Sequence, residues 1–264
     1  MRFSVVHTTR YRYDAPVHLE PHTFRLCPRQ DGSQRVLAYE LAISPAPAGR
    51  AEGLDENGNV MTQAWFTGTV ESLEARSSFE VETLRENPFD FLLSQADREL
   101  PGASSAGNEV GQLARSLATH ARNQTVPFLS ALTQTIFGTV RQVVRRDGAP
   151  HPPGQTLRDQ EGSCRDLAVL FCEACRAVGV TARFVSGYER DASLQENGEM
   201  HAWAEVYLQG GGWRGYDPSR GLAVAASHVA VAAAADPLLA APVTGTYRGA
   251  ARAAMEFQIA MQVG

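Results

Sequence analysis

Alternating apolar and polar positions dominate the first third of the chain. The alternating runs, rich in β-branched and aromatic residues, cover residues 2–13, 23–28, 35–44, 60–66 and 69–84. Turn-forming sequences such as Asp31-Gly32 and Thr67-Gly68 separate them. A period of two is typical of half-buried strands, and strands this closely spaced leave no room for crossover helices. We therefore predict an antiparallel sandwich or barrel that ends near Pro88.

From Leu92 the spacing of apolar residues changes to three or four, which is typical of amphipathic helices. Three segments carry this spacing, at residues 110–121, 129–144 and 164–178. Gly179 is the expected end of the third helical segment. Strand-like runs follow at residues 182–188, 202–208 and 213–217, and Gly210-Gly211-Gly212 supplies a tight turn between the last two.

These patterns predict an α+β protein with two parts. A β-rich domain is expected over residues 1–90, and helices packed on an antiparallel sheet are expected over residues 91–264, with strand-like sequence in the tail. At 264 residues and 44% hydrophobic composition, the chain is large enough to bury a substantial core.

Cys164 is the most informative single residue, because it follows the turn-forming pair Gly162-Ser163 and begins the third helical segment. Unpaired backbone N–H groups and the helix dipole at such a position favour a thiolate, which is the nucleophilic form of cysteine. A buried, inert cysteine is the common alternative for a lone thiol. The position therefore predicts a nucleophile.

His201 and Asp217 complete the chemistry that a cysteine nucleophile requires. They lie at opposite ends of the hairpin formed by residues 202–208 and 213–217. In an antiparallel pair the start of one strand lies beside the end of the next, so the two side chains can meet. We expect Cys164 as nucleophile, His201 as base and Asp217 as the group that orients the imidazole. The other six histidines have no such context.

Four short segments resemble the core of bacterial transglutaminase-like proteins, a branch of the papain-like thiol enzymes. They are Gly162-Ser163-Cys164-Arg165-Asp166-Leu167-Ala168, residues 182–188, Met200-His201-Ala202-Trp203-Ala204-Glu205-Val206 and Gly212-Trp213-Arg214-Gly215-Tyr216-Asp217-Pro218. The resemblance is strong over residues 157–219. It is weaker at residues 7–17, which resemble the opening strand of the β domain in such proteins, and at residues 228–232 and 242–249.

The resemblance implies a papain-like transglutaminase core after a β-sandwich-like domain, with Cys164, His201 and Asp217 in the catalytic roles. It implies acyl transfer from a peptide or carboxamide carbonyl through a cysteine thioester, and it favours hydrolysis, as in a cysteine peptidase or amidase. A protein-glutamine transglutaminase, with an amine as acceptor, is one alternative. A binding module without activity on the same fold is another.

Several other residues have structural interpretations. Cys27, Cys172 and Cys175 read as buried thiols, although metal binding by the last two and a third ligand is a further alternative. Asp166 reads as a structural residue of the helix start, and Trp203 and Trp213 read as hairpin packing or, alternatively, as cleft walls. The backbone N–H of Cys164 is the expected oxyanion donor, and neither Gln155 nor Gln160 is assigned as the second.

Charge and composition indicate which classes of binding partner the chain is suited to. The formal net charge is −5 and basic residues do not cluster, which disfavours nucleic acid. No apolar leader or bilayer-length segment is visible, and four cysteines do not suggest a disulfide framework. We expect a cytoplasmic protein that acts on a peptide or protein, with no membrane partner, no cofactor and no metal. No oligomeric state is selected.

Overall fold

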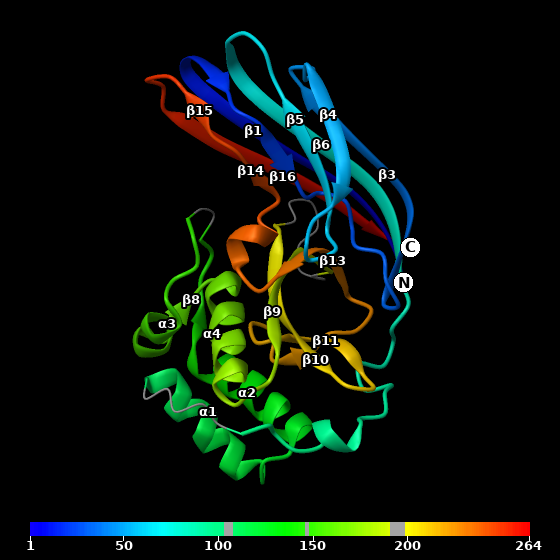
Figure 1. Ribbon diagram of the computed structural model, residues 1–264, viewed down its shortest axis with the longest axis vertical. Helices are drawn as coiled ribbons and strands as arrows, with labels where there is room; N and C mark the ends of the chain where they lie inside the picture. The colour runs from blue at the N-terminus through cyan, green and yellow to red at the C-terminus, as the bar shows by residue number, and fades with distance from the viewer. Residues whose placement is uncertain (103–107, 146–147, 191–198) are drawn as a thin grey trace.

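The computed structural model describes residues 1–102, 108–145, 148–190 and 199–264 (Figure 1). Its strands are β1 (Arg2–Leu19), β2 (His22–Phe24), β3 (Gln34–Ser44), β4 (Gly49–Leu54), β5 (Val60–Trp65), β6 (Val70–Thr83), β7 (Arg141–Gln142), β8 (Glu161–Gly162), β9 (Ala182–Glu189), β10 (His201–Leu208), β11 (Gly212–Asp217), β12 (Leu222–Ala223), β13 (His228–Ala234), β14 (Val243–Thr244), β15 (Tyr247–Arg248) and β16 (Ala253–Val263). Its helices are α1 (Glu109–His120), α2 (Thr125–Thr139), α3 (Pro153–Asp159) and α4 (Cys164–Ala177), with short 3-10 turns η1 (Gln95–Asp97) and η2 (Pro237–Ala240).

The N-terminal part is a sandwich of two antiparallel sheets. One sheet has the order β15-β1-β6-β3, with β16 also paired to β1, and the other has the order β14-β2-β5-β4. Apolar residues between the sheets form one core, which includes Val17, Phe24 and Leu73. The predicted α+β class and β-sandwich-like first domain are confirmed.

The second part packs helices on one face of the sheet β12-β11-β10-β9-β13 (Figure 1). Helix α4 lies against β9 and β10, and α1 and α2 pack against α4. The apolar stripe of α4, with Leu167, Leu170 and Phe171, is fully buried in this core. This burial explains the spacing seen in the sequence. Among the residues that the structure describes, no helix combines the length and apolar character needed to cross a bilayer.

The tail of the chain differs from the sequence expectation. The sequence pattern places everything after residue 90 with the helical part, whereas β14, β15 and β16 join the N-terminal sheets. Strand β16 runs antiparallel to β1 over eleven residue pairs, from Phe3 with Val263 to Tyr13 with Ala253. Periodicity identifies a strand but cannot name its partner when the two are more than 200 residues apart.

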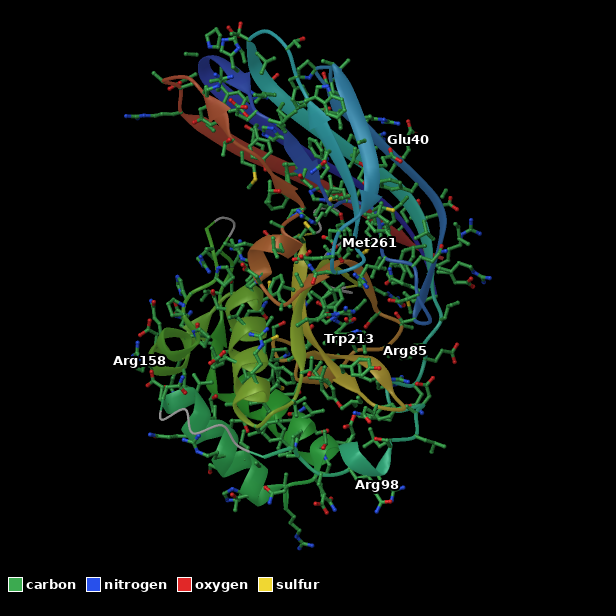
Figure 2. The ribbon with its side chains drawn as sticks, in the orientation of Figure 1. Glu40, Arg85, Arg98, Arg158, Trp213 and Met261 are labelled. Atoms are coloured by element: carbon green, nitrogen blue, oxygen red, sulfur yellow. The ribbon has the colours of Figure 1, made fainter. Side chains whose placement is uncertain are left out.

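Two buried amide side chains of the N-terminal part fasten the two parts together. Gln34 and Ala230 exchange two hydrogen bonds, both 2.8 Å long, between the Gln34 amide and the Ala230 main chain. Asn59 binds the main chain of Ala233 in the same way, at 2.9 and 2.8 Å. The two side-chain amides thus hydrogen-bond main-chain groups of β13, the edge strand of its sheet, as a neighbouring strand would. An apolar interface continues beside them, where Met261 of β16 packs (Figure 2).

Candidate active site

Cys164 is the first residue of α4, and Asp166 fixes the start of this helix. One carboxylate oxygen of Asp166 accepts hydrogen bonds from the main-chain N–H and the hydroxyl of Ser163, both at 2.7 Å. The other oxygen binds Arg145 at 2.6 Å and the N–H of His151 at 2.7 Å. Burial alone would raise the pKa of Asp166, but the hydrogen bonds lower it. Asp166 thus has the structural setting that its sequence position predicts.

His201 lies beside a carboxylate and the thiol. Its Nε2 lies 2.7 Å from Oδ2 of Asp217, and Cys164 is near enough to raise the pKa of the imidazole. Strands β10 and β11 pair with Ala204 opposite Tyr216, so the first residue of β10 and the last of β11 meet. The structure therefore brings the three sequence-predicted site residues together.

The position of Asp217 is set by a local turn. The main-chain N–H and the hydroxyl of Ser219 donate to Oδ1 of Asp217 at 2.9 and 2.7 Å, which is an Asx-turn with an added hydroxyl contact. The side chain of Asp217 is completely buried. The other carboxylate oxygen, Oδ2, accepts hydrogen bonds from His201 and His228.

The electrostatics favour a charged imidazole beside a charged carboxylate. Burial alone would lower the pKa of His201, but its hydrogen bond with Asp217 and its interaction with Cys164 outweigh burial and raise the pKa to about 10. Burial likewise opposes ionisation of Asp217, yet the hydrogen bonds from His201 and His228 hold the pKa of this carboxyl well below its usual range. The arrangement suits an imidazolium that can donate a proton.

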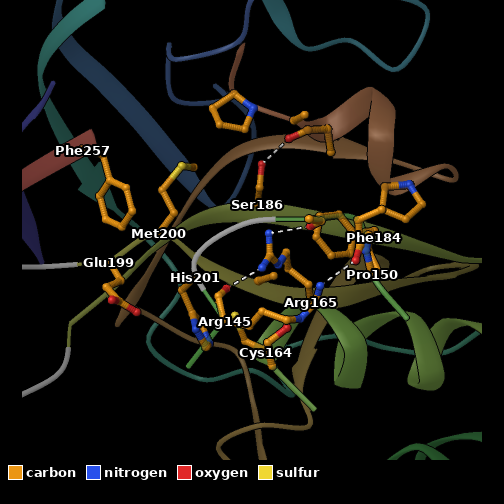
Figure 3. A pocket seen from close by; sticks show the side chains of 18 of the residues that line it. Arg145, Pro150, Cys164, Arg165, Phe184, Ser186, Glu199, Met200, His201 and Phe257 are labelled. Carbon is orange, nitrogen blue, oxygen red and sulfur yellow. Dashed lines mark hydrogen bonds between the residues drawn. The ribbon is translucent and has the colours of Figure 1, made fainter. Parts of the chain in front are cut away.

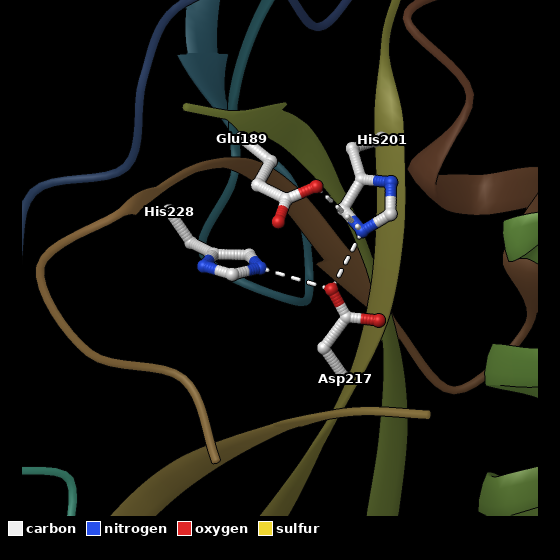
Figure 4. A group of neighbouring side chains, drawn as sticks. All are labelled: Glu189, His201, Asp217 and His228. Carbon is white, nitrogen blue, oxygen red and sulfur yellow. Dashed lines mark hydrogen bonds and ion pairs between the residues drawn. The ribbon is translucent and has the colours of Figure 1, made fainter. Parts of the chain in front are cut away.

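His228 is a second imidazole on the same carboxylate. Its Nε2 lies 3.0 Å from Oδ2 of Asp217 (Figure 4). Its Nδ1 lies 2.9 Å from the hydroxyl of Ser227. Glu189 faces Nε2 of His201 at 3.6 Å. No sequence motif marks His228 as a site residue, because it lies outside the hairpin that carries His201 and Asp217. The pairing of β13 with β9 places His228 beside Asp217.

Glu189, His201, Asp217 and His228 also have the side-chain types that hold metal ions. Their ligand atoms lie within 4.8 Å of one another, the one such group among the residues described. Hydrogen bonds already join the two histidines to Asp217, and Arg220 binds both oxygens of Glu189 at 3.0 and 2.7 Å. A divalent cation would have to displace this network. We therefore interpret the group as hydrogen-bonded.

Cys164 and His201 line a cavity of about 420 Å³ (Figure 3). Cys164 is half-buried, whereas the other three cysteines are buried. The cavity is bounded by both parts of the molecule, with Phe184 and Met200 from the second part and Phe257 from β16. Its volume is in the range typical of ligand sites.

The remaining sequence candidates lie elsewhere. Cys172 and Cys175 are buried in the helical core, and the ligand-type group described above contains neither of them. The side chain of Trp203 is buried against Val185 and Ala233. Neither Trp203 nor Trp213 lines the cavity. The same holds for Gln155 and Gln160, while Gln142 of β7 does line it.

Comparisons with known proteins agree with this architecture. Residues 3–82 match the family model of the bacterial transglutaminase-like N-terminal region, and residues 111–218 match that of the transglutaminase-like superfamily. An uncharacterized protein of Mycobacterium leprae is 27% identical over 99% of this chain and 98% of its own length. Another, from Mycobacterium tuberculosis, is 26% identical over 92% of this chain and 87% of its own length.

A solved structure has the same fold. It is a candidate cysteine protease from Cytophaga hutchinsonii, with a TM-score of 0.70, 20% identity, and coverage of 100% of this chain and 91% of that one. The matches span both the strand-rich first part and the helical core with its buried sheet. The chain therefore belongs to the transglutaminase-like superfamily, in the bacterial form that carries its own N-terminal β region.

Proposed function

We propose that this protein is a cysteine-dependent acyl-transfer enzyme that hydrolyses a peptide or carboxamide bond. The observation that supports it most is the position of His201, which binds Asp217 at 2.7 Å and lines the same cavity as Cys164, whose side chain helps to raise the pKa of the imidazole. Nucleophile, proton carrier and orienting carboxylate are the groups that this chemistry needs.

The reaction has two halves. The Cys164 thiolate attacks the carbonyl carbon, a C–S bond forms, and the π electrons move to the oxygen. The main-chain N–H of Cys164, at the start of α4, is suited to bind this oxyanion. When the intermediate collapses, the C–N bond breaks and the leaving nitrogen takes the proton of His201, which leaves a thioester.

Water then completes the cycle. His201 accepts a proton from water as the oxygen attacks the thioester, the C–S bond breaks, and the acid and the thiolate are released. A primary amine in place of water would give transamidation instead. Asp217 holds the imidazole in one orientation through both halves, and its buried charge stabilises the imidazolium.

A paired assay tests the proposal. One arm measures release of fluorophore from a fluorogenic peptide-amide library, and the other measures incorporation of a fluorescent primary amine into a glutaminyl peptide. Cys164→Ala is the test variant, and Cys27→Ala removes a thiol that does not line the cavity. We expect turnover in the first arm that C164A abolishes and C27A retains.

Other outcomes separate the alternatives. Amine incorporation that exceeds hydrolysis would identify a transglutaminase. Turnover that survives in C164A would contradict the proposed nucleophile. Saturable peptide binding with no turnover in either arm would favour a binding module on this fold.

A further inference from the structure

One face of the long N-terminal sheet continues past the domain interface and becomes a wall of the cavity. Strands β1 and β16 pair His7 with Ile259, Thr9 with Phe257 and Tyr11 with Met255. Alternate residues of a strand point to the same side, so these six side chains share one face. Thr9, Tyr11, Phe257 and Met255 line the same cavity as Cys164 and His201.

The face changes its environment along β16. Ile259 is 1% exposed and packs in the interface with Tyr188 and Val229. Two residues earlier Phe257 is only half-buried, and Met255 is 41% exposed. The sheet thus diverges from the second part on the N-terminal side of Ile259, and there Phe257 lines the same cavity as Cys164 (Figure 3).

The β1 side of this wall carries no charge at neutral pH. His7 binds the hydroxyl of Tyr188 at 2.8 Å and that of Thr9 at 3.0 Å, and burial lowers its pKa to about 4. The charged Arg145, which also lines the cavity, is bound to Asp166 at 2.6 Å. The other charged lining residues, Arg165 and Glu199, also come from the second part, whereas β16 contributes the apolar side chains of Phe257 and Met255.

We propose that Phe257 and Met255 of β16, together with Met200, form a subsite for a large apolar side chain of the substrate. This inference rests on the proposed function. The preferred substrate then carries an aromatic or long aliphatic group beside the carbonyl that Cys164 attacks, and the N-terminal domain determines specificity directly. Burial of such a group against these side chains favours binding by the hydrophobic effect.

Two iodoacetamides test the subsite without a known substrate. In each, the Cys164 sulfur displaces iodide, so that a C–S bond forms and the C–I bond breaks. N-(2-phenylethyl)iodoacetamide carries an apolar group beside its carbonyl, and N-(2-hydroxyethyl)iodoacetamide carries a polar one. Rates of labelling at Cys164 are measured by mass spectrometry of the whole protein. We expect the apolar reagent to react at least about tenfold faster.

Variants of β16 locate the effect. Phe257→Ser and Met255→Ser remove apolar contacts from the wall, and each is expected to lower the ratio of the two rates toward one. The ratio cancels any change in the reactivity of the sulfur itself. Gln258→Ala is the matched control, because Gln258 is exposed, directly follows Phe257 and points to the opposite face of the sheet. Unfolding temperatures of all variants are compared.

The outcomes separate this subsite from the proposed function. Equal rates for both reagents, with Cys164 still labelled selectively, would overturn the subsite and leave the function standing. A tenfold preference that persists in both serine variants would place the subsite elsewhere and overturn this assignment. Labelling of Cys164 no faster than that of the other thiols would contradict the function itself.

Discussion

His228 donates from its Nε2 to the same oxygen of Asp217 that binds His201, at a distance of 3.0 Å. The other ring nitrogen of His228, Nδ1, lies 2.9 Å from the hydroxyl of Ser227, so both nitrogens of this ring have hydrogen-bond partners. A single carboxylate oxygen is thus held from two sides. His228 is a positioning residue for Asp217 in the proposed mechanism.

Replacement of His228 by Ala should lower kcat by about 10- to 100-fold with little change in KM, because a misoriented imidazole slows the reaction while substrate contacts persist. Gln places an N–H donor near the same point, so His228→Gln should recover much of the loss. Steady-state kinetics on the best peptide of the library measure both. His120→Gln, on the exposed surface of α1, is the control. Equal losses in the Ala and Gln variants would argue against positioning through a hydrogen bond.

Alkylation at pH 6 should single out Cys164. Burial raises the pKa of Cys27 to about 11 and that of Cys172 to about 12, and it raises the pKa of Cys175 well above its ordinary value. These thiols are both inaccessible and protonated at pH 6. Iodoacetamide followed by peptide mapping should therefore label Cys164 far faster than the other three. Labelling of all four at one rate would contradict a reactive Cys164.

The His201–Asp217 pair should make stability depend on pH in a defined window. The pKa of His201 is raised to about 10, so its contribution is complete below its unfolded pKa of about 6.5 and is lost as pH rises through 10. The pKa of Asp217 is lowered, so its contribution is present above about pH 4 and is lost as pH falls further.

Urea unfolding across pH measures this window. The difference in unfolding free energy between the wild type and His201→Asn should be largest between about pH 4 and 6.5 and should shrink on both sides. Charges elsewhere contribute to both proteins and largely cancel in the difference. A difference that is constant from pH 4 to 10 would show that His201 is not held as a cation.

The amides at the domain junction should contribute measurably to stability. Asn59→Ala leaves the buried N–H and carbonyl of Ala233 without their partners, which costs about 1–3 kcal/mol. Gln34→Ala should cost a similar amount at Ala230. Urea unfolding measures both, and Gln63→Ala, on the exposed side of β5, is the control. Losses no larger than that of the control would mean that water replaces the amides without cost.

The sequence predicts local features of the site well. A Gly-Ser turn before an amphipathic run is sufficient to locate Cys164 at a helix start, and hairpin spacing is sufficient to bring His201 to Asp217. Both relations depend on short segments whose geometry is set by neighbouring residues. The assays described above test the proposed roles of these residues in catalysis.

The sequence does not predict relations between distant segments. His228 approaches Asp217 only because β13 pairs with β9, and Phe257 enters the cavity only because β16 pairs with β1. An alternating pattern shows that a strand exists and which residues share a face. It does not identify the neighbouring strand, since many edges can accept the same pattern.

The pairing of β16 with β1 also has a consequence for how the protein is made. The wall that carries Phe257 joins residues near one end of the chain to residues near the other. During synthesis the first strand must wait until more than 240 further residues have left the ribosome before its last neighbour is available. Such long-range contacts form late in folding. The cleft is therefore completed only after β16 has left the ribosome, and the nascent chain carries Cys164 before it carries the wall that would select its substrates.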